Sequence, residues 1–340
     1  MGSDRVAETV DFVLANVRSQ EGLRPRGLSS SSSGLRTTLR VLERVALQGS
    51  SLRENQLSAR IYRTVIESLH PDPLRAKSSD EDRLPIGVFI PMHMKDAAMA
   101  HLAVAALRTS SDHPLRSITL CIPDESQVPT WSEAHGVRII RDADVLSTLG
   151  SSRGQLYSLP GWSLQQALKF GYSLCSDSPV LVQCADTVLL RPRVWMTAEA
   201  QILPLRVKPP RHFGRSTSRL LGDEACLRHA SSVTHHQLMQ PEVIRETFGF
   251  RGVAAANLEQ WITDDTDGDL PAEYQVYGSQ LRLTKPKGWV PAGWRHGNGK
   301  VTSAAVRSLP ELSPAEAFES VRRLRAAFPR LYGLSVHVRG

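Results

Sequence analysis

Between residues 86 and 190, short apolar segments typical of buried strands alternate with segments typical of helices. The strand-like segments are residues 86–91, 117–123, 137–140 and 179–190, and the helical segments are residues 97–107, 131–135 and 162–174. Strands that alternate with helices pair in parallel and build layered α/β folds. Right-handed crossovers then place the carboxyl ends of the strands along one rim of the sheet. The order of segments predicts an α/β fold with a mostly parallel sheet flanked by helices.

The last strand-like segment carries an acid at its end. An apolar run at residues 180–182 stops at Ala185 and Asp186, and a second run ends at Arg191. A continuous apolar run is typical of a strand buried on both faces. Open α/β sheets bind their ligands at the carboxyl ends of their strands. Asp186 is therefore either a metal or nucleotide ligand or an ordinary turn acid, since acids are common in turns.

Three other strand ends bring polar residues to the same rim. They are residues 91–93, which include His93, residues 123–125, and residues 141–142, which include Asp142. Because these residues come from separate loops and meet at one edge of a parallel sheet, we expect a ligand-binding cleft there.

The flanking regions differ from this pattern. Residues 1–80 hold apolar positions at helical spacing, amphipathic stretches at 35–47 and 57–69, and a serine run at 29–33, which indicates a helical appendage for packing or homo-oligomer assembly. Later helices are expected at residues 241–248, 253–262, 272–281 and 314–328, with loops rich in Gly, Pro and Trp around 287–300. We expect three parts: an N-terminal helical appendage (1–80), an α/β domain (85–305), and a C-terminal helix and tail (306–340).

Composition narrows the functional class. The chain has 340 residues and a formal net charge of +7, which suits a nucleotide ligand and also nucleic acid. The four cysteines are widely spaced, as in proteins with reduced thiols. The sequence shows no membrane-length apolar run and no signal-peptide pattern, so we expect a cytoplasmic protein. It also lacks dinucleotide, P-loop, zinc-peptidase and hydrolase-elbow motifs.

The predicted helix at residues 162–174 carries two glutamines and a lysine. Lys169 lies four residues after Gln165 and three after Gln166, so it can share a helix face with either. A lysine in a cleft could neutralise a phosphate. The alternative is a surface lysine on an amphipathic helix.

Two later segments carry candidate side chains for substrate chemistry. His235 and His236 precede a predicted helix and could contact a polyol or a metal, although one of them could be a structural histidine. Glu273 opens another predicted helix, where the helix dipole stabilises an acid. The functional interpretation of Glu273 is a general base or a ligand of a sugar hydroxyl.

Residues 294–300 combine basic groups with two glycines. Glycines let a backbone approach a phosphate closely. His296 could ligate a metal, and Arg295 or Lys300 could hold a diphosphate. The alternative is an exposed loop.

Taken in order, these segments resemble a known family. The Gly-Trp-x-x-Gln-Gln-x-x-Lys helix, the strand ending in an Asp-x-Asp-like motif before Arg-Pro, the His-His segment and Glu-Tyr-x-x-Tyr-Gly are similar to motifs of an uncharacterised bacterial family of glycosyltransferase-like proteins with the GT-A fold. The similarity covers roughly residues 86–283. The resemblance implies a GT-A-like, Rossmann-type sheet, a nucleotide-sugar donor, and a divalent cation, Mn²⁺ or Mg²⁺.

Within this resemblance, Asp186 matches the last acid of the Asp-x-Asp motif, which binds the metal bridging the donor diphosphate. Cys184 stands where the first acid is expected. A neutral thiol is a poor ligand for a hard cation, so the resemblance leaves metal dependence open. The His296-Gly297 and Lys300 segment is similar to a His-Gly-Lys loop that completes the metal and diphosphate site in some GT-A families.

The sequence therefore predicts a glycosyltransferase that moves a sugar from a nucleotide-sugar donor to an acceptor hydroxyl. We expect Asp186 and His296 at the metal, and Glu273 or His236 at the acceptor. The residues expected to bind the donor are Pro91, His93, Lys95, Asp96, Asp142, Gln165, Gln166, Lys169, Arg295 and Lys300. Two alternatives stay open: a GT-A-like protein that binds a nucleotide or glycan without turnover, and a basic protein associated with nucleic acid.

Overall fold

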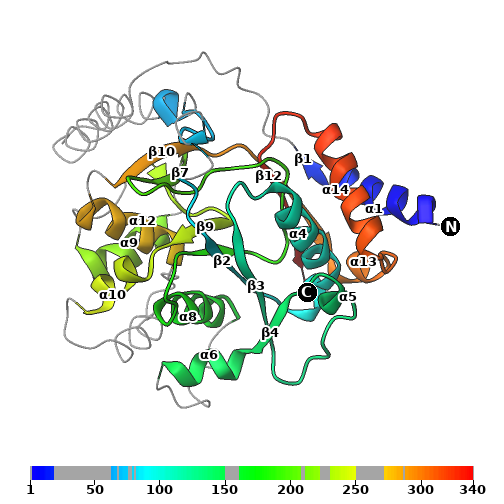
Figure 1. The fold of residues 1–340 in the computed structure, drawn as a ribbon, viewed down its shortest axis with the longest axis horizontal. Helices are drawn as coiled ribbons and strands as arrows, with labels where there is room; N and C mark the ends of the chain where they lie inside the picture. The colour runs from blue at the N-terminus through cyan, green and yellow to red at the C-terminus, as the bar shows by residue number, and fades with distance from the viewer. Residues whose placement is uncertain are drawn as a thin grey trace.

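The computed structural model describes residues 2–18, 63–66, 69–75, 79, 82–149, 161–207, 211–222, 230–249, 272–285 and 288–339 (Figure 1). The serine run at 29–33 and the helices expected at 35–47 and 253–262 lie outside the described residues, as does most of the stretch 57–69.

The centre of the molecule is a five-stranded sheet in the order β4-β3-β2-β5-β9. Its strands are β2 (Ile86–Pro91), β3 (Leu115–Ile122), β4 (Arg138–Arg141), β5 (Val180–Gln183) and β9 (His236–Met239). Strands β2 to β5 pair in parallel, and only the β5–β9 pair is antiparallel. The expected α/β fold with a mostly parallel sheet is therefore confirmed.

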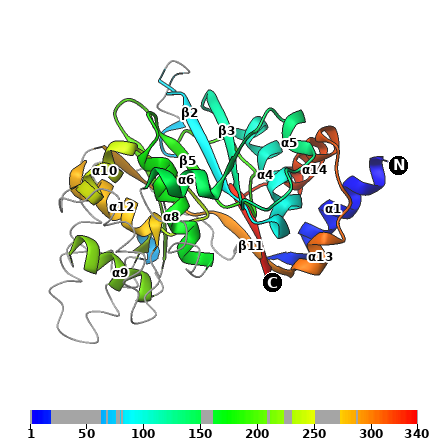
Figure 2. The same ribbon diagram turned by 90° about the horizontal axis from the view of Figure 1, so that it is seen from below.

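Helices cover both faces of this sheet, as Figure 2 shows. They are α4 (Ala97–Ser110), α5 (Trp131–Ala134), α6 (Asp142–Thr148), α8 (Gly161–Leu174), α10 (Pro241–Gly249) and α12 (Glu273–Thr284). Phe89 and Val182 belong to the core beneath α8, whereas Val88 and Leu181 belong to the core beneath α4. Neighbouring strand residues point to opposite faces, so two apolar faces require the continuous apolar runs seen in the sequence.

A second sheet of four strands lies beside the first, in the order β1-β11-β12-β6. Its strands are β1 (Val17–Arg18), β6 (Thr187–Leu189), β11 (His296–Thr302) and β12 (Gly333–Arg339). Strands β11 and β12 are parallel, and β12 runs antiparallel to β6. Helices α1 (Gly2–Asn16), α13 (Ser303–Arg307) and α14 (Pro314–Ala327) gather around it at the end of the molecule that holds the N-terminus (Figures 1 and 2).

A third sheet contains β7 (Gln201–Val207), β8 (Ala230–Ser231) and β10 (Trp289–Gly293). Helix α9 (Arg211–Leu221) packs against α12. No helix among the described residues is long and apolar enough to cross a membrane.

Three expectations about local structure are wrong. The segment 179–190 is not one strand, because β5 pairs with β2 and β9 whereas β6 pairs with β12 in the other sheet. The region expected as loops around 287–300 contains β10 and the first part of β11. The helix α14 does not close the chain, because strand β12 follows it.

Candidate functional site

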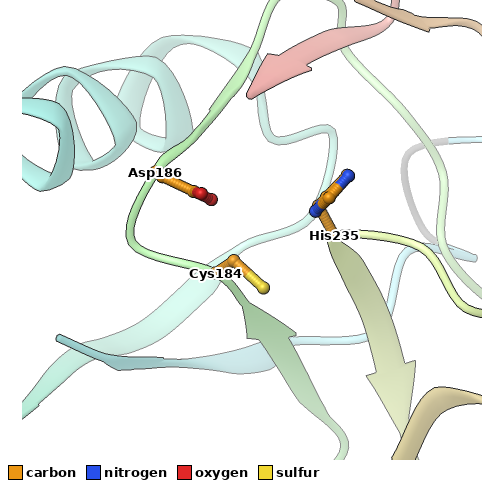
Figure 3. A group of neighbouring side chains, drawn as sticks. All are labelled: Cys184, Asp186 and His235. Carbon is orange, nitrogen blue, oxygen red and sulfur yellow. The ribbon is translucent and has the colours of Figure 1, made fainter. Parts of the chain in front are cut away.

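The candidate site is built on the turn from Cys184 to Asp186, which links β5 in the central sheet to β6 in the four-stranded sheet (Figure 3). The Cys184 amide donates a hydrogen bond to the His235 carbonyl at 2.8 Å. The Asp186 carbonyl accepts one from the Val336 amide at 3.0 Å. Backbone hydrogen bonds thus fix the turn against both β9 and β12.

Three side chains around this turn face one another. Cys184 comes from the end of β5, Asp186 from the turn, and His235 from the residue before β9 (Figure 3). One potential ligand atom from each lies within 4.8 Å of the others, and all three residues are half-buried. We call these residues the triad. In the part of the chain that the structure describes, they form the one group of this kind.

His337 holds the carboxylate of Asp186. Its Nδ1 lies 2.7 Å from Asp186 Oδ2, and the Thr187 hydroxyl lies 3.2 Å from Oδ1. Burial alone would raise the pKa of Asp186, but the hydrogen bond and charge of His337 outweigh burial and lower it. Asp186 is therefore an ionised acceptor in a fixed orientation.

Asp96 adds a second carboxyl to this side of the site. It ends the short 3-10 turn Met94–Asp96, which follows β2 and precedes α4. Burial and the negative charge of Asp186 raise the pKa of Asp96 to about 7. Two acids that interact in this way compete for one proton unless a cation lies between them.

A buried polar network contacts the triad at Cys184. Lys169 Nζ lies 2.7 Å from Glu273 Oε1, and both side chains are 1% exposed. Lys169 also contacts Gln165 Oε1 at 3.2 Å and Cys184 Sγ at 3.5 Å. Burial acts to lower the pKa of Lys169, but its contacts with Cys184 and Glu273 outweigh burial and raise it. The lysine is therefore charged and already paired.

The same network joins α8 to α12. Gln166 Oε1 accepts a hydrogen bond from the Glu273 amide at 3.0 Å. That amide is at the start of α12, where the N-cap residue Ala272 supplies no side-chain acceptor. Gln166 therefore satisfies a helix amide that would otherwise be buried without a partner. We call Lys169, Glu273, Gln165 and Gln166 the Lys169 network.

Rings pack around the triad. The His235 ring centroid lies 4.7 Å from that of His337 and 5.1 Å from that of His296. The His296 ring stacks on Trp294 at 4.4 Å and its Nε2 lies 2.8 Å from the Ser335 hydroxyl. Burial lowers the pKa of His235 to about 3, so its ring is neutral and can ligate a metal at neutral pH.

His296 itself is not part of the triad. It is 2% exposed, and a Cβ at position 333 would lie 2.7 Å from its Nδ1. Gly333 is therefore required by the close approach of this ring. The predicted role of His296 as a metal ligand stays a prediction, with its ring packed behind His235.

His235 lies directly before strand β9 and His236 is the first residue of that strand, and the helix expected after them is α10. Neighbouring residues at a strand point to opposite sides. His235 therefore faces Cys184 and Asp186, whereas His236 is 1% exposed, packs against Trp195 at 4.9 Å, and lies 3.4 Å from Arg193 Nη1.

The other predicted donor-site residues occupy varied positions. Pro91 is buried at the end of β2, and the exposed His93 caps the following 3-10 turn by accepting a hydrogen bond from the Lys95 amide. Asp142 is buried at the start of α6, beyond β3 and β2 from the triad in strand order. Arg295 is half-buried, and Lys300 is exposed on β11 directly across from His337 on β12.

The sequence interpretation missed His337. The signal was present, because Leu334, Val336 and Val338 alternate with Ser335 and His337, the pattern of a strand with one apolar face. His235 was identified only as one of two adjacent histidines, and Cys184 only as a replaced acid.

The chain matches no known protein-family profile, and no curated protein matches it. Among solved structures, it is similar to mouse xyloside xylosyltransferase 1 in its apo form, with 11% identity and a TM-score of 0.39 over 74% of this chain and 97% of the other. It is also similar to glucosyl-3-phosphoglycerate synthase from Mycobacterium tuberculosis in complex with Mn²⁺, uridine diphosphate and phosphoglyceric acid. That likeness has 11% identity and a TM-score of 0.39 over 77% of this chain and 86% of the other. At these values neither likeness assigns an activity to this chain.

The triad can hold a divalent cation, and its donors restrict which one. Mg²⁺ takes oxygen ligands in a near-ideal octahedron. The triad instead offers one carboxylate, one imidazole and one sulfur. Burial raises the pKa of the Cys184 thiol to about 11, so without a metal it is a neutral thiol. The donor set does not fit Mg²⁺.

Proposed function

We propose that this protein is a glycosyltransferase that moves a sugar from a nucleotide-sugar donor to an acceptor hydroxyl. The observation that supports the proposal is the contact between segments that the sequence resemblance had joined only by order. Lys169 of the Gln-Gln-Lys helix reaches both Cys184, beside the strand-end acid, and Glu273 of the Glu-Tyr segment. The motifs therefore surround one turn at the ligand-binding end of a parallel sheet.

In this proposal the residues after β2 bind the nucleoside, and the triad faces the donor diphosphate. Asp186 is ionised and oriented by His337. Burial and the charge of Asp186 raise the pKa of Asp96. Arg295 and Lys300, on the neighbouring β11 region, supply positive charge for the leaving diphosphate. Charged groups that are already in position before the reaction are usually the largest single contribution to the rate enhancement of such transfers.

We propose roles for Glu273 and His236 that differ from those predicted from the sequence. Each is 1% exposed, and each is already engaged, Glu273 with Lys169 and His236 with Arg193. A base must lie within hydrogen-bond reach of the acceptor hydroxyl. We therefore propose that both position the site and do not act on the acceptor.

The proposal is tested by calorimetric titration of the full chain with UDP- and GDP-sugars, followed by an assay of sugar release. In the presence of a divalent cation, Asp186→Ala is expected to weaken donor binding at least about tenfold, because it removes the carboxylate that would hold that cation against the donor diphosphate. Asp177→Ala, at an exposed acid after α8, is the matched control and should bind as the parent does. No binding of any nucleotide sugar by the parent protein would reject the proposal.

A second candidate is a protein that binds the donor without turnover. It is favoured by the pairing of Glu273 with Lys169, which leaves that acid unavailable as a base. The two candidates separate in one assay. An enzyme releases sugar from the bound donor in the presence of acceptors or water, whereas a binder shows affinity and no release.

A further inference from the structure

We infer that the triad is a binding site for a thiophilic transition metal of the Zn²⁺ class, with Cys184 Sγ, an Asp186 oxygen and a His235 nitrogen as ligands. The inference deepens the proposed function and rests on it for its role in catalysis. Metal binding itself can be measured without any sugar transfer.

The chemical types of the three ligand atoms favour a metal of the Zn²⁺ class. Zn²⁺ is bound in proteins by thiolate sulfur, imidazole nitrogen and carboxylate oxygen, and the triad presents one of each. Soft and borderline cations gain from a thiolate ligand, whereas Mg²⁺ and Mn²⁺ prefer oxygen. The replacement of an acid by Cys184 therefore changes the preferred cation and need not remove the site.

The distances between the ligand atoms are close to those of a zinc site. All three ligand atoms lie within 4.8 Å of one another. Ligand bonds of about 2.0–2.3 Å place the atoms of a tetrahedral zinc site about 3.3–3.8 Å apart. A pair at the 4.8 Å limit must therefore close by about 1–1.5 Å, which side-chain rotation can supply. The hydrogen bond between the Cys184 amide and the His235 carbonyl, at 2.8 Å, already fixes two of the ligands relative to each other.

The surroundings of the ligands are also those of a metal site. Groups behind metal ligands orient them and tune the affinity. His337 Nδ1 binds Asp186 Oδ2 at 2.7 Å, and the Lys169 ammonium lies 3.5 Å from Cys184 Sγ. A cation beside the sulfur favours the thiolate that a metal needs.

The site is open to a further ligand. None of the three residues is fully buried, and the Asp186 side chain is 15% exposed, so the inference places the ion within reach of solvent. Three protein ligands leave a position of a tetrahedral ion free, which distinguishes catalytic zinc sites from structural ones. The chemical class of group that fits this position is an anionic oxygen, such as a diphosphate oxygen.

The test uses the full chain freed of metal with a chelator and titrated with Co²⁺ as a visible substitute for Zn²⁺. The expected result is a thiolate-to-cobalt charge-transfer band that saturates at one equivalent and disappears on addition of Zn²⁺. Excess Mg²⁺ should leave the band unchanged. A cobalt complex without this band, or competition by Mg²⁺ at the concentration at which Zn²⁺ competes, would overturn the inference.

Variants test whether the charge-transfer band arises from the named ligands. Cys184→Ser should abolish the band, while Cys175→Ser and Cys226→Ser keep it. His337→Ala removes a group behind Asp186, and it should weaken Zn²⁺ binding about 10–100-fold without abolishing the band. Cys184→Asp should move the preference toward Mn²⁺ by about tenfold or more, because it restores an oxygen donor. A band that persists in Cys184→Ser contradicts the assignment.

The outcomes separate this inference from the proposed function. A protein that shows the cobalt band but neither binds nor cleaves any nucleotide sugar keeps the metal site and rejects the transferase. Sugar transfer that continues unchanged with chelator, in a protein without the band, rejects only the metal site.

Discussion

The Lys169 network meets the triad at Cys184, and the two groups differ in how completely their polar groups are paired. In the network, Lys169 and Glu273 are each 1% exposed and bonded to each other. In the triad, every residue is half-buried, and burial together with the charge of Asp186 raises the pKa of Asp96 to about 7. The comparison teaches that the buried charges satisfy each other, whereas the half-buried ones include two interacting acids, which is the arrangement behind our proposal of a cation ligand.

The largest effect on stability is expected from removing one partner of the buried Lys169–Glu273 pair. Glu273→Ala leaves the Lys169 ammonium buried without its carboxylate, and it should lower the free energy of unfolding by about 3–5 kcal/mol. Chemical denaturation measures the loss. The matched control is Glu242→Ala at a surface pair, where the 50% exposed Glu242 lies 2.8 Å from Lys285. That change should cost about 0–1 kcal/mol.

A double variant decides whether the loss comes from the unpaired charge. Glu273→Leu combined with Lys169→Met removes both charges and should recover most of the lost stability, since apolar replacements of buried pairs are often neutral. An equal loss in Glu242→Ala and Glu273→Ala would contradict the structural role of the network.

A smaller effect is expected where the network caps α12. Gln166→Ala removes the acceptor of the Glu273 amide and should cost about 1–3 kcal/mol, the penalty of a buried donor without a partner. Gln127→Ala changes an exposed glutamine and should stay within about 0.5 kcal/mol. Thermal or chemical unfolding compares the two variants, and equal stabilities would show that Gln166 does not cap the helix.

The smallest effect is expected at Asp96, beside the triad. Here the substitution should raise the free energy of unfolding, whereas the previous ones lower it. A folded-state pKa of about 7 for Asp96 lies above the ordinary value of 3.8, so the folded state holds a proton that the unfolded state has lost. The metal-free protein therefore loses stability as pH rises from about 4 to 7. Asp96→Asn removes this loss and should stabilise the protein by about 1 kcal/mol at pH 8.

Denaturation at pH 8 and pH 5 in the presence of chelator measures this effect. The gain from Asp96→Asn should shrink at pH 5, where the parent carboxyl is protonated in the folded state. A gain of the same size at both pH values would mean that the pKa of Asp96 is not raised in the folded protein.

The sequence predicted the central sheet because its strands are buried on both faces and its helices follow in order. Periodicity could not predict that the segment 179–190 divides between two sheets. That division depends on the pairing of β6 with β12, which comes more than 140 residues later in the chain. The same distance explains why Asp186 was recognised while His337 was missed.

The site chemistry was predictable to a similar degree. Lys169, Glu273 and Asp186 were all singled out by type and position, yet sequence could not show that the first two neutralise each other. It also could not show which of two adjacent histidines faces the turn, because that depends on the pairing of β9 with β5.

The turn between β5 and β6 limits how this region can change. Residues before it are committed to the register of the central sheet, and residues after it to the register of the four-stranded sheet. Because strand side chains alternate between faces, insertion or deletion of one residue would turn one strand over relative to its sheet. The length of the turn is therefore fixed by two sheets at once, whatever side chains it carries.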